Sequence, residues 1–269
     1  MRGGTAGGRV RRFHLPRPWA HVPGRRPGRG ETSRIAFATT SLGWGTTLPE
    51  AIRFAAENAF GGVEVMADNP LLHPDLLGHP ARREARRLAE DAGISLSLHV
   101  PLSMNNIASH LPGQRRESLR ELLAAIELAA DLGAGVVVVH PGRLAIENLV
   151  TSWTDVAPRM QEVVDLAREL GGPWVGVCFD VAHAHLAETV EGALAAAPGE
   201  LLFHWHLHDS QGQKDEHLEL GRGTVSFTPC IPRMRASRAL LALEVLGEEG
   251  DPPGALARSR AWLERLLAA

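Results

Sequence analysis

The chain has 269 residues, 44% of them hydrophobic, which is enough to form the core of one large domain. No apolar run approaches the roughly 20 residues that a bilayer-spanning helix needs, so we expect a soluble protein. The two cysteines, Cys178 and Cys230, are too few for a disulfide framework. A reducing cytoplasm is therefore the expected compartment.

The formal charge of −3 hides an uneven distribution. Residues 1–34 contain nine arginines and one acid, Glu31, in a segment rich in glycine and proline. We expect this extension to be disordered, and to be a basic arm for nucleic acid, an organellar transit peptide or a tail without function. Residues 35–269 keep 19 basic and 30 acidic side chains, a formal charge of −11, which argues against a polyanionic partner.

Short apolar runs alternate with longer amphipathic runs from Ile35 onward. This alternation predicts parallel strands joined by helices, and at this length it favours a (β/α)₈ TIM barrel over a doubly wound sheet. The expected domain is 35–269. The expected strands are 34–41, 61–68, 94–101, 135–142, 174–183, 201–209 and 240–245. The expected helices are 48–60, 81–93, 115–133, 155–170 and 254–268.

One expected helix, 115–133, carries an apolar stripe at helical spacing. We predict that this stripe faces the core. Its members are Leu119, Leu122, Leu123, Ile126 and Ala130.

Residues of the metal-binding type stand at the carboxyl ends of five different expected strands. In a barrel these ends meet at one rim, where barrel enzymes keep their active sites. One such residue is readily explained as a helix cap, but five on five strands predict a shared site. They are His99, His140, Asp180, His206 and Glu244.

Two further motifs add candidate ligands. "FDVAH" places Asp180 and His183 three residues apart, so one turn after the strand can direct both at a single centre. "KDEH" places Asp215 and His217 on the same side of an extended loop. Imidazole together with carboxylate suits a divalent metal: zinc or manganese first, then cobalt or iron, rather than magnesium.

These segments resemble the xylose-isomerase-like TIM barrels, which include sugar phosphate isomerases and epimerases and DNA-repair enzymes of the endonuclease IV type (AP endonuclease family 2). The resemblance covers Ile35 to the C-terminus, through "LHVPLSMNNIAS", "VVVVHPG", "GVCFDVAHAHL" and "HLHDSQGQKDEHLELGRGTVSF". It gives no ligand role to His185, His204 and His208, which we interpret as lining or ligand-orienting residues. It implies these metal ligands: His99, His140, Asp180, His183, His206, Asp215, His217 and Glu244.

A glutamate on the fifth strand completes the ligand set of the family, and here the chain departs from the pattern. "LAIENLV", 144–150, resembles that strand, with Glu147 as the ligand. A parallel crossover needs about ten residues or more, but the four residues from Pro141 to Leu144 span at most about 14 Å. We therefore expect a barrel that lacks or distorts the helix after strand 4. Alternatively the sequence carries a deletion, or 144–150 opens that helix and Glu147 is a surface carboxylate.

Three other residues have open roles. Glu64 ends an expected strand and either reaches the rim or pairs with an arginine. Trp44 either stacks on a sugar or packs in its loop. Arg222, in "GRG", either binds a phosphate or is solvated, and the glycines around it would let the backbone approach a ligand.

The leading hypothesis is a metal-dependent isomerase or epimerase of a sugar, sugar phosphate or related polyol. The metal would polarise the carbonyl and stabilise the enediolate, while Glu147 and Glu244 would remove and return a proton on carbon. The expected partner is a small molecule, and an oligomer is compatible with the sequence.

Two rival hypotheses use the same barrel. An endonuclease IV-like zinc phosphodiesterase would use Asp215 and His217 in a multi-metal cluster on abasic DNA. The acidic body and the lack of a basic, aromatic-interleaved stretch argue against nucleic acid. The other rival is a catalytically impaired metal-binding barrel that has lost a helix.

Overall fold

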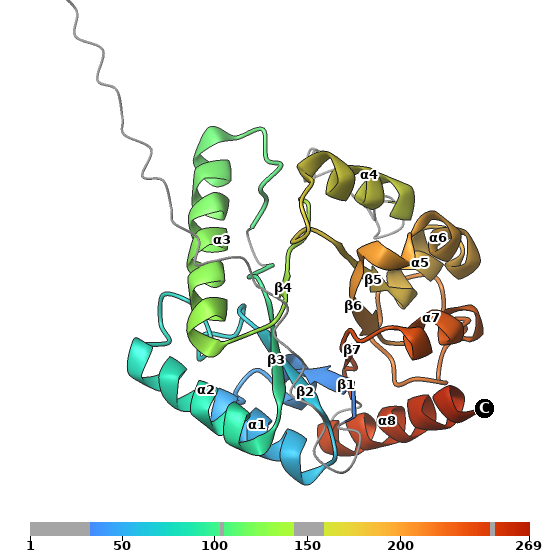
Figure 1. Ribbon diagram of the computed structural model, residues 1–269, viewed down its shortest axis with the longest axis horizontal. Helices are drawn as coiled ribbons and strands as arrows, with labels where there is room; N and C mark the ends of the chain where they lie inside the picture. Colours follow the sequence, from blue (N-terminus) through green and yellow to red (C-terminus); the bar gives the residue numbers. More distant parts are fainter. Residues whose placement is uncertain (1–32, 103–104, 143–158, 248–250) are drawn as a thin grey trace, which may run out of the picture. The chain divides into compact units, whose positions relative to one another are not determined.

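The computed structural model describes residues 33–102, 105–142, 159–247 and 251–269 (Figure 1). Its strands form one parallel sheet in the order β4-β3-β2-β1-β7-β6-β5. β1 pairs with both β2 and β7, so the first and last described strands are neighbours in a nearly closed barrel. This confirms the predicted α/β TIM barrel. The strands are β1 (Ile35–Ala38), β2 (Gly62–Met66), β3 (Ser95–His99), β4 (Val137–Val138), β5 (Val177–Asp180), β6 (Leu202–Leu207) and β7 (Leu241–Leu243).

Helices surround the sheet on its outer side (Figure 1). Between helices and sheet lies an apolar core in which Phe37, Phe179 and Trp205 are fully buried. The helices are α1 (Leu48–Glu57), α2 (His79–Ala92), α3 (Pro112–Leu132), α4 (Met160–Leu170), α5 (Val181–Ala187), α6 (Val190–Ala196), α7 (Ile231–Ala236) and α8 (Pro252–Ala268).

Local sequence signals set the ends of the first helices. At the start of α1, Glu50 accepts hydrogen bonds from the Thr47 backbone N–H at 2.8 Å and from its hydroxyl at 2.6 Å, which forms a capping box. α2 and α3 end at Gly93 and Gly133, whose φ angles of 69° and 71° are left-handed. Glycine adopts this conformation without a steric penalty, so both helices stop there.

The predicted core stripe of α3 is wrong. Leu119, Leu123 and Ile126 are 46%, 50% and 39% exposed. Ala130 is exposed as well, and Leu122 is only partly buried. The face that packs inward has the same helical spacing but smaller members: Ala125, Leu128, Ala129 and Leu132. Periodicity revealed one apolar stripe, but this helix has two, and the structure buries the other one.

The sheet is open between β4 and β5, which are its two edge strands among the described residues. A pocket of about 170 Å³ lies there, lined by residues of both strands such as Val138 and Cys178. Residues 143–158 fall between β4 and α4 and lie outside the described residues. The expected fifth strand, the helix after β4 and Glu147 therefore lie outside them too, as do residues 1–32 of the predicted extension.

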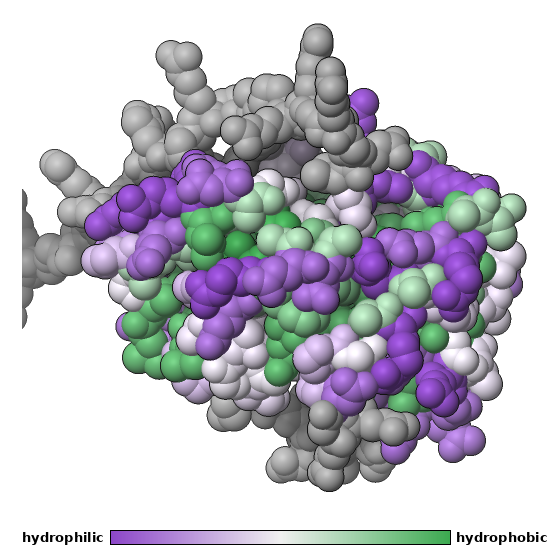
Figure 2. Space-filling view, turned by 90° about the horizontal axis from the view of Figure 1, so that it is seen from below, coloured by the Kyte–Doolittle hydropathy of each residue, from purple (hydrophilic) through white to green (hydrophobic). Residues whose placement is uncertain are grey.

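Exposed faces of the helices mix polar and apolar side chains. Figure 2 shows the face that forms the lower edge of Figure 1, where hydrophilic and hydrophobic residues are interspersed. Among the described residues, none of the helices combines the length and the apolar character needed to cross a membrane.

The two faces of α3 give a stability prediction. Leu128 is fully buried and Leu123 is half exposed on the same helix. Leu128→Ala should lower the free energy of unfolding by about 2–5 kcal/mol, because it removes buried methyl groups and leaves a cavity. Leu123→Ala, the matched control, should change it by no more than about 0.5 kcal/mol. Urea unfolding measures both values, and equal losses would contradict the assignment of the faces.

Candidate metal centre

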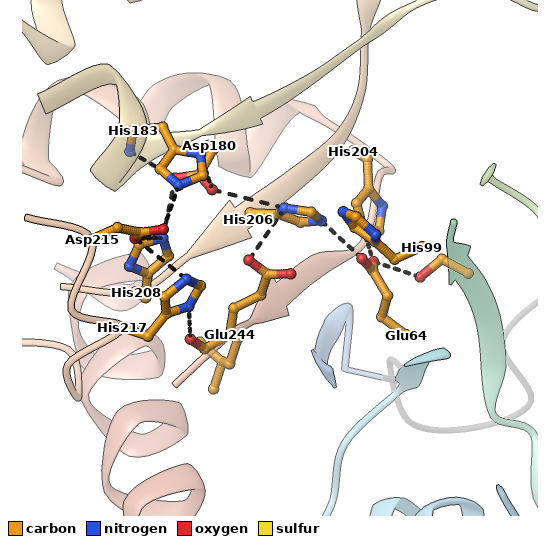
Figure 3. Close-up of polar contacts among 12 residues, drawn as sticks. Glu64, His99, Asp180, His183, His204, His206, His208, Asp215, His217 and Glu244 are labelled. Atoms are coloured by element: carbon orange, nitrogen blue, oxygen red, sulfur yellow. Dashed lines mark hydrogen bonds and ion pairs between the residues drawn. The ribbon is translucent and has the colours of Figure 1, made fainter. Parts of the chain in front are cut away.

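The parallel strands bring the predicted strand-end residues together. The register of the sheet places Asp180 of β5 opposite His206 of β6, and His206 opposite Ala242 of β7, two residues before Glu244. Asp180, His206 and Glu244 are all buried. Figure 3 shows their side chains meeting, with Asp180 and Glu244 both directed at the same end of the His206 ring.

The first cluster consists of Asp180, His206 and Glu244. Nδ1 of His206 lies 3.4 Å from Oε2 of Glu244 and 3.8 Å from Oδ2 of Asp180. Oδ2 of Asp180 is buried and accepts no hydrogen bond. A buried carboxylate oxygen that accepts no hydrogen bond costs free energy, and a cation beside it would offset that cost, whether the His183 ring 3.1 Å away or a metal ion.

The second cluster consists of His183, His208, Asp215 and His217. Nε2 of His183 lies 3.1 Å from Oδ2 of Asp215, and Nε2 of His217 lies 3.3 Å from Oδ1. This Oδ1 is also buried, and His217 is its ion-pair partner. The other nitrogen of His183 is 3.1 Å from Oδ2 of Asp180, so the second cluster adjoins the first.

The separations in both clusters fit a bound metal ion. With zinc–ligand bonds of about 2.0–2.1 Å, two donor atoms of a tetrahedral site lie about 3.3 Å apart. The nitrogen–oxygen distances within the two clusters range from 3.1 to 3.8 Å. An ion could therefore enter each cluster with small movements of the side chains.

The loop that carries Asp215 and His217 is held by the buried side chain of Asp209. Its carboxylate accepts hydrogen bonds from the backbone N–H groups of Ser210, Gly221 and Val225 at 2.9–3.1 Å. A Cβ on Gly223 would come within 2.3 Å of this carboxylate. The glycines of "GRG" therefore allow close packing inside the protein. Sequence reasoning missed the role of Asp209.

His217 is fixed from both sides. Its backbone has a φ of 50°, in the left-handed region, and its Nδ1 donates a hydrogen bond to the backbone carbonyl of Glu244 at 2.6 Å. Nε2 is consequently the nitrogen directed at Asp215. Such a hydrogen bond from the remote nitrogen typically orients a metal-binding histidine. The same residue, Glu244, thus positions the second cluster through its backbone and belongs to the first through its side chain.

Charges inside the clusters shift the pKa values of their members. Burial alone would raise the pKa of Asp180, but His183, His208 and His206 outweigh it and hold that pKa well below its usual range. The Asp215 carboxyl is lowered in the same way by hydrogen bonds with His183 and His217. Both carboxylates are therefore ionised and ready to bind a cation.

His99 and His140 lie next to each other on the β3–β4 side, with ring centroids 5.2 Å apart. Nδ1 of His99 is 2.8 Å from the backbone oxygen of Val100, which leaves Nε2 directed elsewhere. Burial lowers the pKa of His140 to about 3, so its ring is neutral, as metal binding requires. Glu147, a further predicted ligand, lies outside the described residues.

A third group of buried residues was not expected. Glu64 pairs with His204 and His206 instead of an arginine or the open rim. Burial raises the pKa of Glu64, but the charges of His206 and His204 outweigh this effect and hold it well below its ordinary value. In the sequence, the acid within the apolar run "GGVEV" was the signal that Glu64 has a special role. It did not reveal that His204 and His206 are its partners.

The interpretation of His208 and His185 as lining residues stays a prediction. The ring of His208 stacks on that of His217 with centroids 3.9 Å apart and planes 9° apart. Nε2 of His208 lies 3.4 Å from Oδ1 of Asp180 and 3.8 Å from Oδ1 of Asp215, so this ring borders the carboxylates of both clusters. Nε2 of His185 is 3.1 Å from the hydroxyl of Thr224. Arg222 is exposed.

The pair of Asp215 and His217 predicts how stability depends on pH. Burial lowers the pKa of His217, but the Asp215 hydrogen bond and the charge of Glu244 outweigh it and raise the pKa from 6.5 to about 9. A raised pKa stabilises the metal-free fold fully below pH 6.5, and this contribution is lost as the pH rises through 9. Denaturant unfolding should show a larger loss between these two pH values for the wild type than for His217→Gln. Parallel profiles would contradict the assignment.

Comparison with known proteins places this site in a family. The model of the xylose isomerase-like TIM barrel matches residues 52–145 and 143–266, two segments that meet between β4 and α4. The probable endonuclease 4 of Mycobacterium ulcerans (strain Agy99) is 27% identical over 213 residues, which cover 65% of this chain and 84% of that protein.

Solved structures share the fold. D-psicose 3-epimerase with D-tagatose from Clostridium cellulolyticum H10 has a TM-score of 0.68 at 15% identity, over 87% of this chain and 99% of that one. The IolI protein with a bound zinc atom has a TM-score of 0.66 at 14% identity, over 87% and 98%. With its barrel and a family match over most of its length, the chain belongs to the xylose isomerase-like TIM barrel family.

Proposed function

We propose that this protein is a metal-dependent isomerase or epimerase of a sugar, sugar phosphate or related polyol. The first cluster carries the proposal: Asp180, His206 and Glu244 meet at the carboxyl ends of the strands with metal-sized separations, and an oxygen of Asp180 has no hydrogen-bond partner. Barrel enzymes keep their active sites at this end. The fold similarity to a D-psicose 3-epimerase supports the same class of reaction.

The described residues would take separate roles in metal binding and in proton transfer. Asp180, His206 and Glu244 would hold a divalent ion, for which zinc or manganese is expected and cobalt or iron is compatible with the donors. When bound, such an ion polarises a carbonyl and stabilises charge on two neighbouring oxygens. Glu244 would remove or return the proton on the substrate carbon from one side. Glu147, proposed for the other side, lies outside the described residues.

An endonuclease IV-like zinc phosphodiesterase is the second candidate. The second cluster favours it, because His183, Asp215 and His217 are spaced for a further ion beside the first. The 27% identity to a probable endonuclease 4 points the same way. The formal charge of −11 on residues 35–269, from 19 basic and 30 acidic side chains, opposes DNA binding and makes this the weaker candidate.

Metal content is the first test. Protein purified without added metal and without a nickel-binding tag should contain one divalent ion per chain in the first cluster, as measured by elemental analysis. Asp180→Ala and His206→Ala should lose most of it, because each removes a donor. His204→Ala, the matched control on the same strand as His206, should retain it. Equal metal retention in all three variants would refute the ligand assignment, and two or three zinc ions per chain would favour the phosphodiesterase.

Activity separates the two candidates. Ketose–aldose and epimerisation screens run in D₂O should show deuterium entering the substrate carbon, and Glu244→Gln should slow this by about 10²–10⁴-fold, because a general base is lost. His217→Gln should leave the exchange largely intact if the second cluster is not part of that reaction. Cleavage of abasic-site DNA that depends on both Glu244 and His217 would instead establish the phosphodiesterase.

A further inference from the structure

Glu64 lies inside the barrel at the middle of β2 and is completely buried. Its Oε1 is 2.9 Å from Nε2 of His206. Its Oε2 is 2.5 Å from Nε2 of His204 and accepts a hydrogen bond of 2.9 Å from the hydroxyl of Ser97. Both oxygens of this carboxylate are therefore satisfied by side chains, and Figure 3 shows Glu64 reaching the histidines of β6.

This group is held by hydrogen bonds and does not have the dimensions of a metal site. Glu64, His204 and His206 all belong to residue types that bind metals. Their nitrogen–oxygen distances of 2.5 and 2.9 Å are, however, shorter than the separation of about 3.3 Å between donors of a tetrahedral ion. The first and second clusters, at 3.1–3.8 Å, have the wider spacing.

The contact with Glu64 determines which nitrogen of His206 is available. An ionised carboxylate only accepts hydrogen bonds, so Nε2 of His206 must carry a proton. Nδ1 is then the nitrogen that can offer a lone pair to an ion, and Nδ1 faces Glu244 and Asp180 at 3.4 and 3.8 Å.

The ring of His206 also lies beside two other imidazole rings. It lies 5.8 Å from the ring of His99 in a stacked arrangement and 5.3 Å from that of His204 at an interplanar angle of 85°. A rotation that exchanged the two nitrogens would break the Glu64 hydrogen bond and disturb these contacts. Steric packing thus holds the ring in its place, while the carboxylate fixes its protonation.

We propose that Glu64 is a positioning residue that keeps the proton on Nε2 of His206 and thereby makes Nδ1 the metal-binding nitrogen of the first cluster. Ser97 and His204 hold the Glu64 carboxylate in place through its other oxygen. This inference rests on the proposed metal site, but it does not depend on which reaction that site performs.

The direct test is NMR of the unmodified chain. Long-range ¹H–¹⁵N spectra of ¹⁵N-labelled, zinc-loaded protein distinguish the two nitrogens of each histidine, with His206 assigned by its loss in His206→Gln. We expect zinc on Nδ1 and a proton on Nε2 of His206. Zinc on Nε2, or no zinc on this ring, would overturn the proposal. A chain with zinc on Nδ1 but no epimerase activity would uphold it while refuting the proposed function.

Variants test the role of the carboxylate. Glu64→Gln keeps the shape but places an amide N–H group, a donor, among the two histidines. We expect zinc to bind about 10–100-fold more weakly, as competition with a chromophoric chelator would show, with the number of ions unchanged. The same variant should show a mixture of His206 tautomers, a change that a merely structural role would not produce.

His204→Gln is the matched control, because its side-chain amide can still donate to Glu64. Its zinc affinity should stay within about threefold of that of the wild type if His204 affects His206 only through its contact with Glu64. Loss of one whole ion per chain in Glu64→Gln would mean that Glu64 is itself a ligand and would overturn the proposal, as would wild-type affinity with an unchanged tautomer. Circular dichroism checks folding, and the spectrum of the unmodified chain decides the question if this variant unfolds.

Discussion

Buried carboxylates surrounded by histidines are the constraint on which this structure depends. Glu64, Asp180 and Glu244 have little or no exposed surface, and an isolated ionised carboxylate in such a place costs far more free energy than a domain's net stability. The metal-free chain compensates each charge with imidazoles that lie close by. Ions in the two clusters would replace these pairs, so metal binding and the stability of the barrel interior are linked through the same side chains.

The curvature of the sheet brings together side chains from strands that are not neighbours in it. Glu64 on β2 and His206 on β6 are separated in the sheet by β1 and β7, yet they meet across the interior because both side chains point inward. A single histidine therefore connects the interior to the rim, with one nitrogen on Glu64 and the other beside Asp180 and Glu244. The loop held by Asp209 then adds the second cluster.

The sequence was sufficient to predict the barrel and much of the candidate site. The strand-end positions and the "FDVAH" and "KDEH" spacings are local patterns, and parallel strands bring the residues in them to one rim. The inward face of α3 was not predictable, since two apolar stripes share the helical period and only packing chooses Leu128 over Leu123. The partners of Glu64 and the stacking of His208 on His217 arise from long-range contacts, which no local pattern encodes.

Electrostatics favours a small anionic or neutral substrate over DNA at this rim. The one divalent ion proposed for the first cluster would offset the charge of Asp180 and Glu244, which hold it, and would attract a phosphate oxygen at short range. That local field is screened within about 8 Å at physiological ionic strength. A sugar phosphate fits inside this range, whereas a duplex must also contact the surrounding surface of a body with a formal charge of −11, given by 19 basic and 30 acidic residues. The same acidic surface that repels a polyanion leaves a metal-centred site open to a small one.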